Sequence, residues 1–133
     1  MLITKESDYA IRIIRALKDR ELLTIQEICE LELIPKQFAY KILKKLSAAG
    51  LVEIRRGSGG GCLLGKALSD ITLYDIITAV DDDFAIIHCL QNSSVCEYRK
   101  KSGVCSVHGE LNRIQKVLEK ELRQNSLETL LAP

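Results

Sequence analysis

Apolar residues recur at helical spacing in the first part of the chain. Thr4 is a suitable N-cap for a first helix, because its hydroxyl can accept a bond from a free backbone N–H. The apolar face of that helix is formed by Ala10, Ile13, Ile14 and Leu17. Thr24 and Glu27 form a capping-box pattern for a short second helix, with Ile28 and Cys29 facing inward. The pattern therefore predicts two amphipathic helices before residue 30.

A third helix is predicted from Pro35, which suits a first helical turn because it has no N–H to leave unpaired. Its apolar residues are Phe38, Ala39, Ile42, Leu43 and Leu46. Gly50 stands where a left-handed C-terminal residue is expected. Three short helices with a tight connection between the second and the third predict a helix-turn-helix.

An alternating segment from Leu51 to Arg55 follows and predicts a β-strand. Glycines at 57 and 59–61 separate it from the apolar stretch 62–64, so the segment predicts a β-hairpin, which behind a helix-turn-helix is a wing. A dinucleotide-binding fingerprint would need glycine at position 62, which is Cys62, and no Gly-Lys-Ser/Thr follows. The glycines therefore indicate a turn rather than a nucleotide site.

Two further helices are predicted in the second half of the chain. Thr72 is a cap for a helix that ends at the acidic run 81–83. From about Gly109 to Gln124 the sequence has a long apolar stripe, formed by Leu111, Ile114, Val117, Leu118 and Leu122. Such a stripe must be covered, either by a partner subunit or by the chain's own domain. The predicted fold is mainly α, with a small β-hairpin wing and a long C-terminal dimerisation helix.

Charge is distributed unevenly along the 133 residues. The net charge of +1 taken alone argues against a nucleic-acid partner, but residues 36–66 carry +6 and residues 67–98 carry −6. A local basic surface is what binding to phosphates requires, whatever the total charge. The alternative is that each block is simply a solvated surface.

Several classes of protein are excluded or disfavoured by the sequence. A hydrophobic fraction of 47% with 28% charged residues excludes wholesale disorder. We find neither a signal peptide nor an apolar run as long as a membrane span, so we expect a cytoplasmic protein without a membrane partner. Neither of the two histidines lies in a nucleophile–base motif, so we expect no enzyme.

Three of the five cysteines lie in a polar segment and are spaced C-x6-C-x8-C: Cys89, Cys96 and Cys105. His108 follows three residues after the last of them. The spacing leaves open an iron–sulfur cluster, a structural zinc site, and a loop with redox-reactive or idle thiols. Cys29 and Cys62 lie in apolar surroundings, where we expect them to be core residues.

Four motifs carry a resemblance to a known family. They are Ile34-Pro35-Lys36-Gln37-Phe38, Ala49-Gly50-Leu51-Val52, Arg56-Gly57-Ser58-Gly59-Gly60-Gly61 and Ile71-Thr72-Leu73-Tyr74-Asp75-Ile76-Ile77. With the cysteine triad, the chain from residue 1 to about 125 resembles the iron–sulfur cluster regulators, winged-helix transcription factors of the IscR and NsrR types.

The resemblance implies an iron–sulfur cluster, [2Fe-2S] or [4Fe-4S], bound by the thiolates of Cys89, Cys96 and Cys105. The fourth ligand differs between the family's types. His108 matches the histidine of the IscR type, and Asp8 matches the aspartate that reaches across from the partner subunit in the NsrR type. The implied organisation is a DNA-binding domain over 1–80, a cluster-binding loop over 81–108, and a dimerisation helix and tail over 109–133.

The implied function is that of a homodimeric regulator, a repressor of transcription, which binds double-stranded promoter DNA and senses redox state, nitric oxide or cluster status. The candidate DNA-binding residues on the third helix and the wing are Lys36, Gln37, Tyr40, Lys41, Arg55, Arg56 and Ser58. The sequence departs from the family at Tyr40, where the IscR type has an acidic residue, and at Cys62, commonly aromatic.

Two alternative functions remain open at this point. The chain could be a winged-helix regulator of the same family that binds zinc or no cofactor. It could also be a small cluster carrier or a protein-interaction module. The local basic block argues against the second alternative, because a carrier has no need of a basic surface suited to phosphate.

Overall fold

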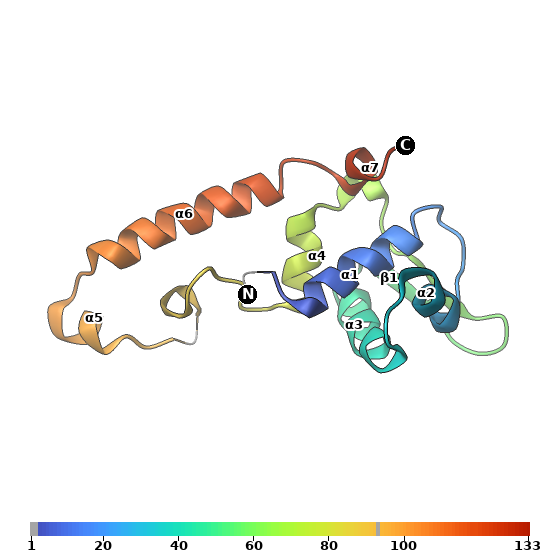
Figure 1. The fold of residues 1–133 in the computed structure, drawn as a ribbon, viewed down its shortest axis with the longest axis horizontal. Helices are drawn as coiled ribbons and strands as arrows, with labels where there is room; N and C mark the ends of the chain where they lie inside the picture. Colours follow the sequence, from blue (N-terminus) through green and yellow to red (C-terminus); the bar gives the residue numbers. More distant parts are fainter. Residues whose placement is uncertain (1–2, 93) are drawn as a thin grey trace.

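The chain forms a helical body and a long arm (Figure 1). The structure, a computed structural model, describes residues 3–92 and 94–133, so residues 1, 2 and 93 lie outside it. The elements in order are α1 (Lys5–Ala16), α2 (Ile25–Glu32), α3 (Lys36–Ala48), β1 (Val52–Arg55), β2 (Gly61–Leu64), η1 (Leu68–Asp70), α4 (Leu73–Val80), η2 (His88–Leu90), α5 (Glu97–Ser102), α6 (Ser106–Leu122) and α7 (Leu127–Leu130). The mainly helical fold with one hairpin confirms the predicted fold class.

Helices α1 to α4 of the body share one aliphatic core. Its fully buried side chains include Ile13, Ile28, Ile42, Leu46 and Ile76. The predicted starts of α1, α2 and α4 are confirmed. Thr4 Oγ1 accepts a bond from Ser7 N, and the capping boxes after Thr24 and Thr72 are both complete. These caps fix where each helix begins. The packing of the helices on the shared core then holds α2 and α3 in the helix-turn-helix arrangement.

The wing is a two-stranded antiparallel hairpin, as predicted, with Val52 paired to Leu64 and Arg55 to Gly61. A bridge between Leu23 and Cys62 joins it to the loop before α2. Leu23 N donates to Cys62 O at 2.9 Å, and Cys62 N donates to Leu23 O at 2.7 Å. The wing is therefore anchored to the helix-turn-helix at its second strand.

The turn between α2 and α3 contains a leucine in an unfavourable backbone conformation. Leu33 has φ 56° and ψ 50°, the left-handed region, and its side chain is 81% exposed. Its N–H and that of Ile34 both bond to Cys29 O, which ends α2. For residues other than glycine this conformation costs about 1–2 kcal/mol. The backbone bonds and the tight connection to α3 therefore impose it on Leu33.

Replacing Leu33 with glycine is expected to raise the free energy of unfolding by about 1 kcal/mol, because strain is relieved and little burial is lost. The matched control is Leu31→Gly, also an exposed leucine but inside α2. It should lower the free energy of unfolding by about 1 kcal/mol. Urea unfolding curves measure both, and effects of the same sign would contradict the argument.

The arm begins where the chain leaves the body after α4 and returns along α6 (Figure 1). Helix α6 starts at Ser106, three residues before the predicted start, because Cys105 serves as N-cap and its sulfur accepts the His108 N–H. The short helices α5 and α7 were not predicted, since they span only six and four residues. Leu127 N donates to Ile71 O at 2.8 Å, so α7 ties the far end of α6 to the body.

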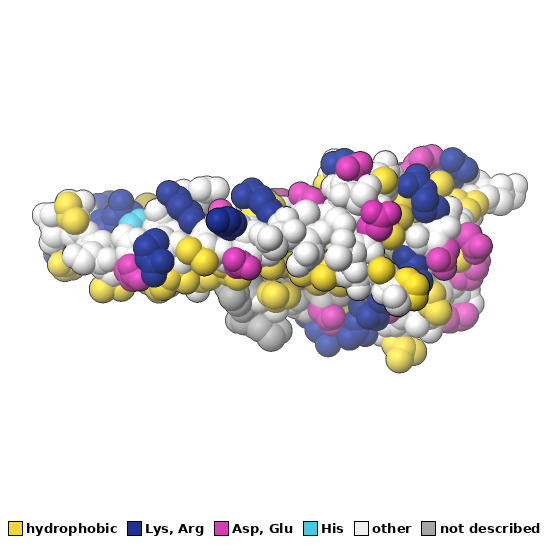
Figure 2. Space-filling view, turned by 90° about the horizontal axis from the view of Figure 1, so that it is seen from above, with side chains coloured by type: hydrophobic (Ala, Val, Ile, Leu, Met, Phe, Trp, Pro, Cys, Tyr) yellow, Lys and Arg dark blue, Asp and Glu magenta, His cyan; other side chains and the backbone are white. Residues whose placement is uncertain are grey.

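The apolar stripe of α6 is only partly covered by the chain itself. Leu111, Leu118 and Leu122 are half-buried, whereas Ile114 and Val117 are exposed. Figure 2 shows hydrophobic side chains along one edge of the arm. Packing of the stripe on its own domain therefore accounts for part of the burial that the sequence pattern requires.

Candidate nucleic-acid interface

The third helix presents the residues that the sequence predicted for DNA contact. Lys36, Gln37, Tyr40 and Lys41 all lie in its first half and are exposed. Buried Ala39, Ile42, Leu43 and Leu46 hold the opposite face against the core. The helical period therefore places the polar side chains outward, where a recognition helix contacts base edges.

Three more predicted residues lie on the wing. Arg55 ends β1, and Arg56 and Ser58 follow in the turn; all three are exposed. Arg55 Nε donates to Glu53 Oε1 at 3.0 Å. Gly57 and Gly59 adopt φ +90° and +76°, and they form the tight turn that directs this segment away from the body.

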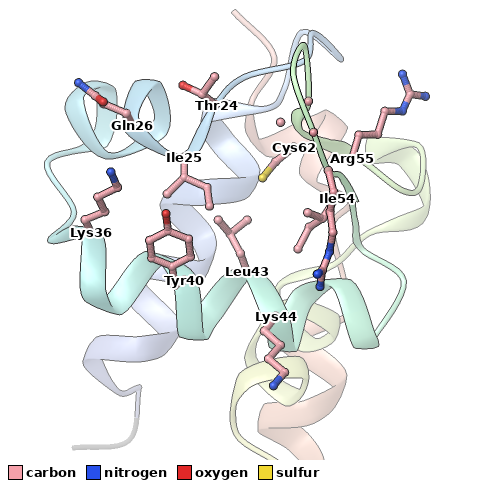
Figure 3. A pocket seen from close by; sticks show the side chains of 14 residues that line it. Thr24, Ile25, Gln26, Lys36, Tyr40, Leu43, Lys44, Ile54, Arg55 and Cys62 are labelled. Carbon is pink, nitrogen blue, oxygen red and sulfur yellow. The ribbon is translucent and has the colours of Figure 1, made fainter.

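Helix α3 and the wing enclose a cleft of about 860 Å³. Its walls come from the start of α2, from α3 and from the hairpin (Figure 3). Apolar side chains form the floor: Ile25, Leu43, Ile54 and Cys62. Four cationic residues and no carboxylate line the cleft in the part of the chain that the structure describes, namely Lys36, Lys44, Arg55 and Arg56.

The cleft brings together predicted residues from distant parts of the sequence, and it adds others. Lys36, Tyr40, Arg55 and Arg56 line it, whereas Gln37, Lys41 and Ser58 do not. Lys44 of the basic block also lines it, as do Thr24 and Gln26, which no sequence signal assigned to the interface. The capping box predicts where α2 begins. That the first residues of α2 line the cleft follows only from the packing of α2 beside the wing.

Lys41 is held on the other side of α3. Its Nζ donates to Glu6 Oε1 at 2.8 Å, and Lys45 Nζ donates to Glu6 Oε2 at 3.0 Å. These two hydrogen bonds, Lys41 first, hold the pKa of the Glu6 carboxyl below its ordinary value. Lys45 Nζ also donates to Val80 O at 3.1 Å, which joins α3 to the end of α4.

The two cysteines of the body are separate from those of the arm. Cys62 is fully buried, as predicted, and Cys29 is half-buried on α2. Burial raises the pKa of both thiols. A buried thiol with a raised pKa is a poor nucleophile and a poor metal ligand, because the thiolate is the reactive form. Cys62 therefore acts as a small apolar residue of the cleft floor.

The three cysteines of the predicted cluster loop lie in a helical turn or directly before a helix. Cys89 lies in η2, Cys96 precedes α5, and Cys105 precedes α6; all are half-buried. The described residues contain no group of three His, Cys, Asp or Glu side chains arranged to hold a metal ion. The donor set suits iron in its chemistry, but this single chain does not bring the donors together.

The two candidate fourth ligands differ in their surroundings. Asp8 lies in the first turn of α1 and forms an ion pair with Arg12 at 3.0 Å. His108 lies in the first turn of α6, and its Nδ1 is buried without a hydrogen-bond partner among the described residues. A buried ring nitrogen without a partner is costly unless something binds it. The ring nitrogen Nδ1 of His108 is therefore available to bind a metal, whereas the Asp8 carboxylate is already paired with Arg12.

A buried glutamine connects the cysteine-containing segment to α6. Gln115 Oε1 accepts a bond from Ile86 N at 2.8 Å, and its Nε2 donates to Phe84 O at 3.4 Å. Its side chain is one of the two buried polar side chains among the described residues. These bonds satisfy backbone groups in a segment without regular structure and fix that segment, three residues before Cys89, against α6.

Comparison with known proteins identifies relatives across almost the whole chain. The model of the Rrf2 family, described as an iron-dependent transcriptional regulator, matches residues 3–133. The HTH-type transcriptional regulator NsrR of Bacillus subtilis is 34% identical over 116 residues, covering 84% of this chain and 77% of that protein. Protein aau3 of Rhizobium meliloti is 36% identical over 97 residues, which are 71% of this chain but less than two thirds, 63%, of that protein.

Solved structures share the fold. The global cysteine regulator CymR of B. subtilis matches with a TM-score of 0.75 and 23% identity, over 98% of this chain and 95% of that one. IscR of T. potens matches with a TM-score of 0.73 and 20% identity, over 97% and 85%. Identities this low support the fold alone.

These matches confirm the resemblance and the expectation that the protein is not an enzyme. None of the described helices combines the length and the hydropathy that a bilayer span requires. The family match extends over the winged helix, the cysteine-containing segment and α6. The chain belongs to the Rrf2 family of transcriptional regulators.

Proposed function

We propose that this protein is a cytoplasmic transcriptional repressor that binds double-stranded promoter DNA, with α3 in the major groove and the wing against the backbone or minor groove. The cleft between α3 and the wing carries this proposal, because four cationic side chains and no carboxylate line it among the described residues. A surface of that charge attracts phosphates locally, although the net charge of the chain is only +1.

The DNA-binding form is a homodimer. Exposed Ile114 and Val117 on α6 form an apolar surface that a second copy of the same helix would cover. Two copies would also present two recognition helices to two half-sites of the DNA. One short helix contacts too few base pairs to be specific by itself. The expected solution state is therefore a dimer.

Cys89, Cys96 and Cys105 would hold an iron–sulfur cluster, with His108 or Asp8 as the fourth ligand. Support comes from the soft thiolate donor set, the partnerless Nδ1 of His108 and the relation to NsrR. Such a cluster would supply a centre that responds to redox state or nitric oxide. The three cysteines form no metal-binding group among the described residues, so binding requires the segment around η2 and α5 to rearrange.

The chain's own contacts provide a route from that segment to the DNA-binding surface. Gln115 holds residues 84–86 on α6, and Lys45 holds the end of α4 on α3. A rearrangement near Cys89 therefore acts on the dimerisation helix and on the recognition helix through hydrogen bonds. The two ligands, DNA and cluster, would then be coupled reciprocally.

Replacing Arg56 with alanine is expected to weaken binding to every duplex several-fold and to reduce the slope of log affinity against log salt by about one unit, the value for one lost phosphate contact. Fluorescence anisotropy measures both, using the duplex upstream of the protein's own gene and a mixed-sequence duplex. Lys116→Ala, which removes an exposed cation from α6, is the control. Unchanged binding by Arg56→Ala would remove Arg56 from the interface.

A further inference from the structure

Glu6 occupies a position between the start of α1 and the recognition helix. Its carboxylate accepts bonds from Lys41 at 2.8 Å and from Lys45 at 3.0 Å. The Glu6 side chain is 28% exposed, whereas that of Lys41 is 60% exposed. One side of this charge cluster is therefore open to solvent and the other is packed into the body.

This pairing, which Lys41 shares with Lys45, sets Lys41 apart from Lys36 and Lys44 of the same helix. Lys36 and Lys44 face the cleft, and the described residues include no ion-pair partner for either. Lys41 faces a carboxylate of its own chain instead. A carboxylate offers an ammonium the same charge and the same acceptor oxygens as a DNA phosphate. Glu6 and DNA would therefore bind the same atom of Lys41.

We propose that Glu6 is an internal competitor of DNA for Lys41 and so sets the affinity of the recognition helix. This rests on the proposed DNA-binding function. In the free protein Glu6 neutralises Lys41, and on binding a phosphate or a base acceptor displaces the carboxylate. Because the pair is exposed, its displacement costs little, so Glu6 lowers the affinity without preventing binding.

Lys45 keeps the Glu6 carboxylate paired after Lys41 has left it. Its ammonium donates both to Glu6 and to Val80 O, and it is less exposed than Lys41. When Lys41 turns towards DNA, Lys45 remains on the Glu6 carboxylate and keeps it hydrogen-bonded in the same place. Glu6 is therefore not left as an unpaired, partly buried charge, which would make DNA binding costly.

The same contacts make Glu6 a point where the sensing segment can act. Lys45 reaches the last residue of α4, from which the chain continues towards Cys89. A shift of that end of α4 moves Lys45 and changes how firmly Glu6 is held. Glu6 would then compete more or less strongly for Lys41, so a change in the arm alters DNA affinity.

The test is Glu6→Gln, which keeps the shape of the side chain and removes its charge. Relative to wild type, affinity for a mixed-sequence duplex at low salt should rise about three- to tenfold, because no carboxylate competes for Lys41. The salt slope should stay the same, because Lys41 makes the same phosphate contact in both complexes. The matched control is Glu110→Gln on α6, which removes an equal charge and an ion pair with Arg113. It should leave both values unchanged.

A double-mutant cycle with Lys41→Gln identifies the route of the effect. In the Lys41→Gln background, Glu6→Gln should change neither affinity nor slope. Two results would overturn the proposal: an equal gain in affinity in the Lys41→Gln background, or no gain when Glu6→Gln is made alone. In either case, DNA binding by the wild-type protein would leave the proposed function standing. Failure of the wild type to bind any duplex would instead overturn the proposed function. Circular dichroism melts confirm that each variant is folded.

Discussion

Anaerobically purified wild-type protein is expected to be brown, and Cys96→Ala is expected to be colourless. Loss of one thiolate leaves two of the three proposed cysteine ligands, which is too few for a cluster that takes its remaining ligand from His108 or Asp8. The measurement is the visible charge-transfer absorbance together with the iron content. Cys29→Ser is the matched control, because Cys29 lies on α2, away from the segment containing Cys89, Cys96 and Cys105. It should retain the colour.

The same measurement separates the remaining alternatives. Colourless wild-type protein with stoichiometric zinc would favour the zinc site, and colourless protein without metal would favour a regulator without a cofactor. Within a coloured protein, His108→Ala and Asp8→Ala distinguish the fourth ligand, because only the true ligand's loss should change the Mössbauer spectrum. The partnerless Nδ1 of His108 and the ion pair of Asp8 with Arg12 lead us to expect the larger change in His108→Ala.

Gly60→Ala is expected to disrupt the wing and to reduce DNA affinity by about tenfold or more, as for the loss of several phosphate contacts. A Cβ at this position would lie 2.2 Å from Arg55 O and 2.9 Å from Gly57 O. Both are backbone atoms of the same turn and cannot move aside separately. The turn must therefore open, which displaces Arg55 and Arg56 from the cleft. Anisotropy with a mixed-sequence duplex measures the loss.

Gly109→Ala is the control for that experiment. Its Cβ would meet nothing within 4 Å, and it lies inside α6. This variant should therefore bind DNA with wild-type affinity. Its free energy of unfolding should rise by up to about 1 kcal/mol, because alanine is more favourable than glycine in a helix interior. Equal DNA affinity for Gly60→Ala and wild type would show that the turn geometry of the wing is not needed for binding.

Local sequence signals predicted most of the body. Thr4, Thr24 and Thr72 begin helices because a hydroxyl before an apolar period satisfies free N–H groups of the first turn. The glycine run predicted the wing for a similarly local reason, since few other residues tolerate positive φ. By contrast, α5, α7 and the early start of α6 were missed. Their lengths or caps, such as Cys105, give no distinct pattern.

The candidate DNA-binding residues divide in the same way. The helical period placed Lys36, Tyr40 and Lys41 on the exposed side of α3, and the structure confirms that exposure. Nothing in the spacing indicated that Lys41 faces Glu6, 35 residues earlier in the chain. The sequence likewise gave no reason to group Gln26 with Arg55, which share the cleft only because the Leu23–Cys62 bridge holds the wing beside α2.

The sequence by itself therefore determined the helices of the body, the wing, the basic block and the family. These depend on periods, caps and charges that act within a few residues. Only the tertiary structure decided which cations face the cleft, which two pair with Glu6, and that the three arm cysteines form no metal-binding group among the described residues. Such pairings depend on how α1, α3, α4 and the hairpin pack, because contact between distant residues is set by burial of the shared core.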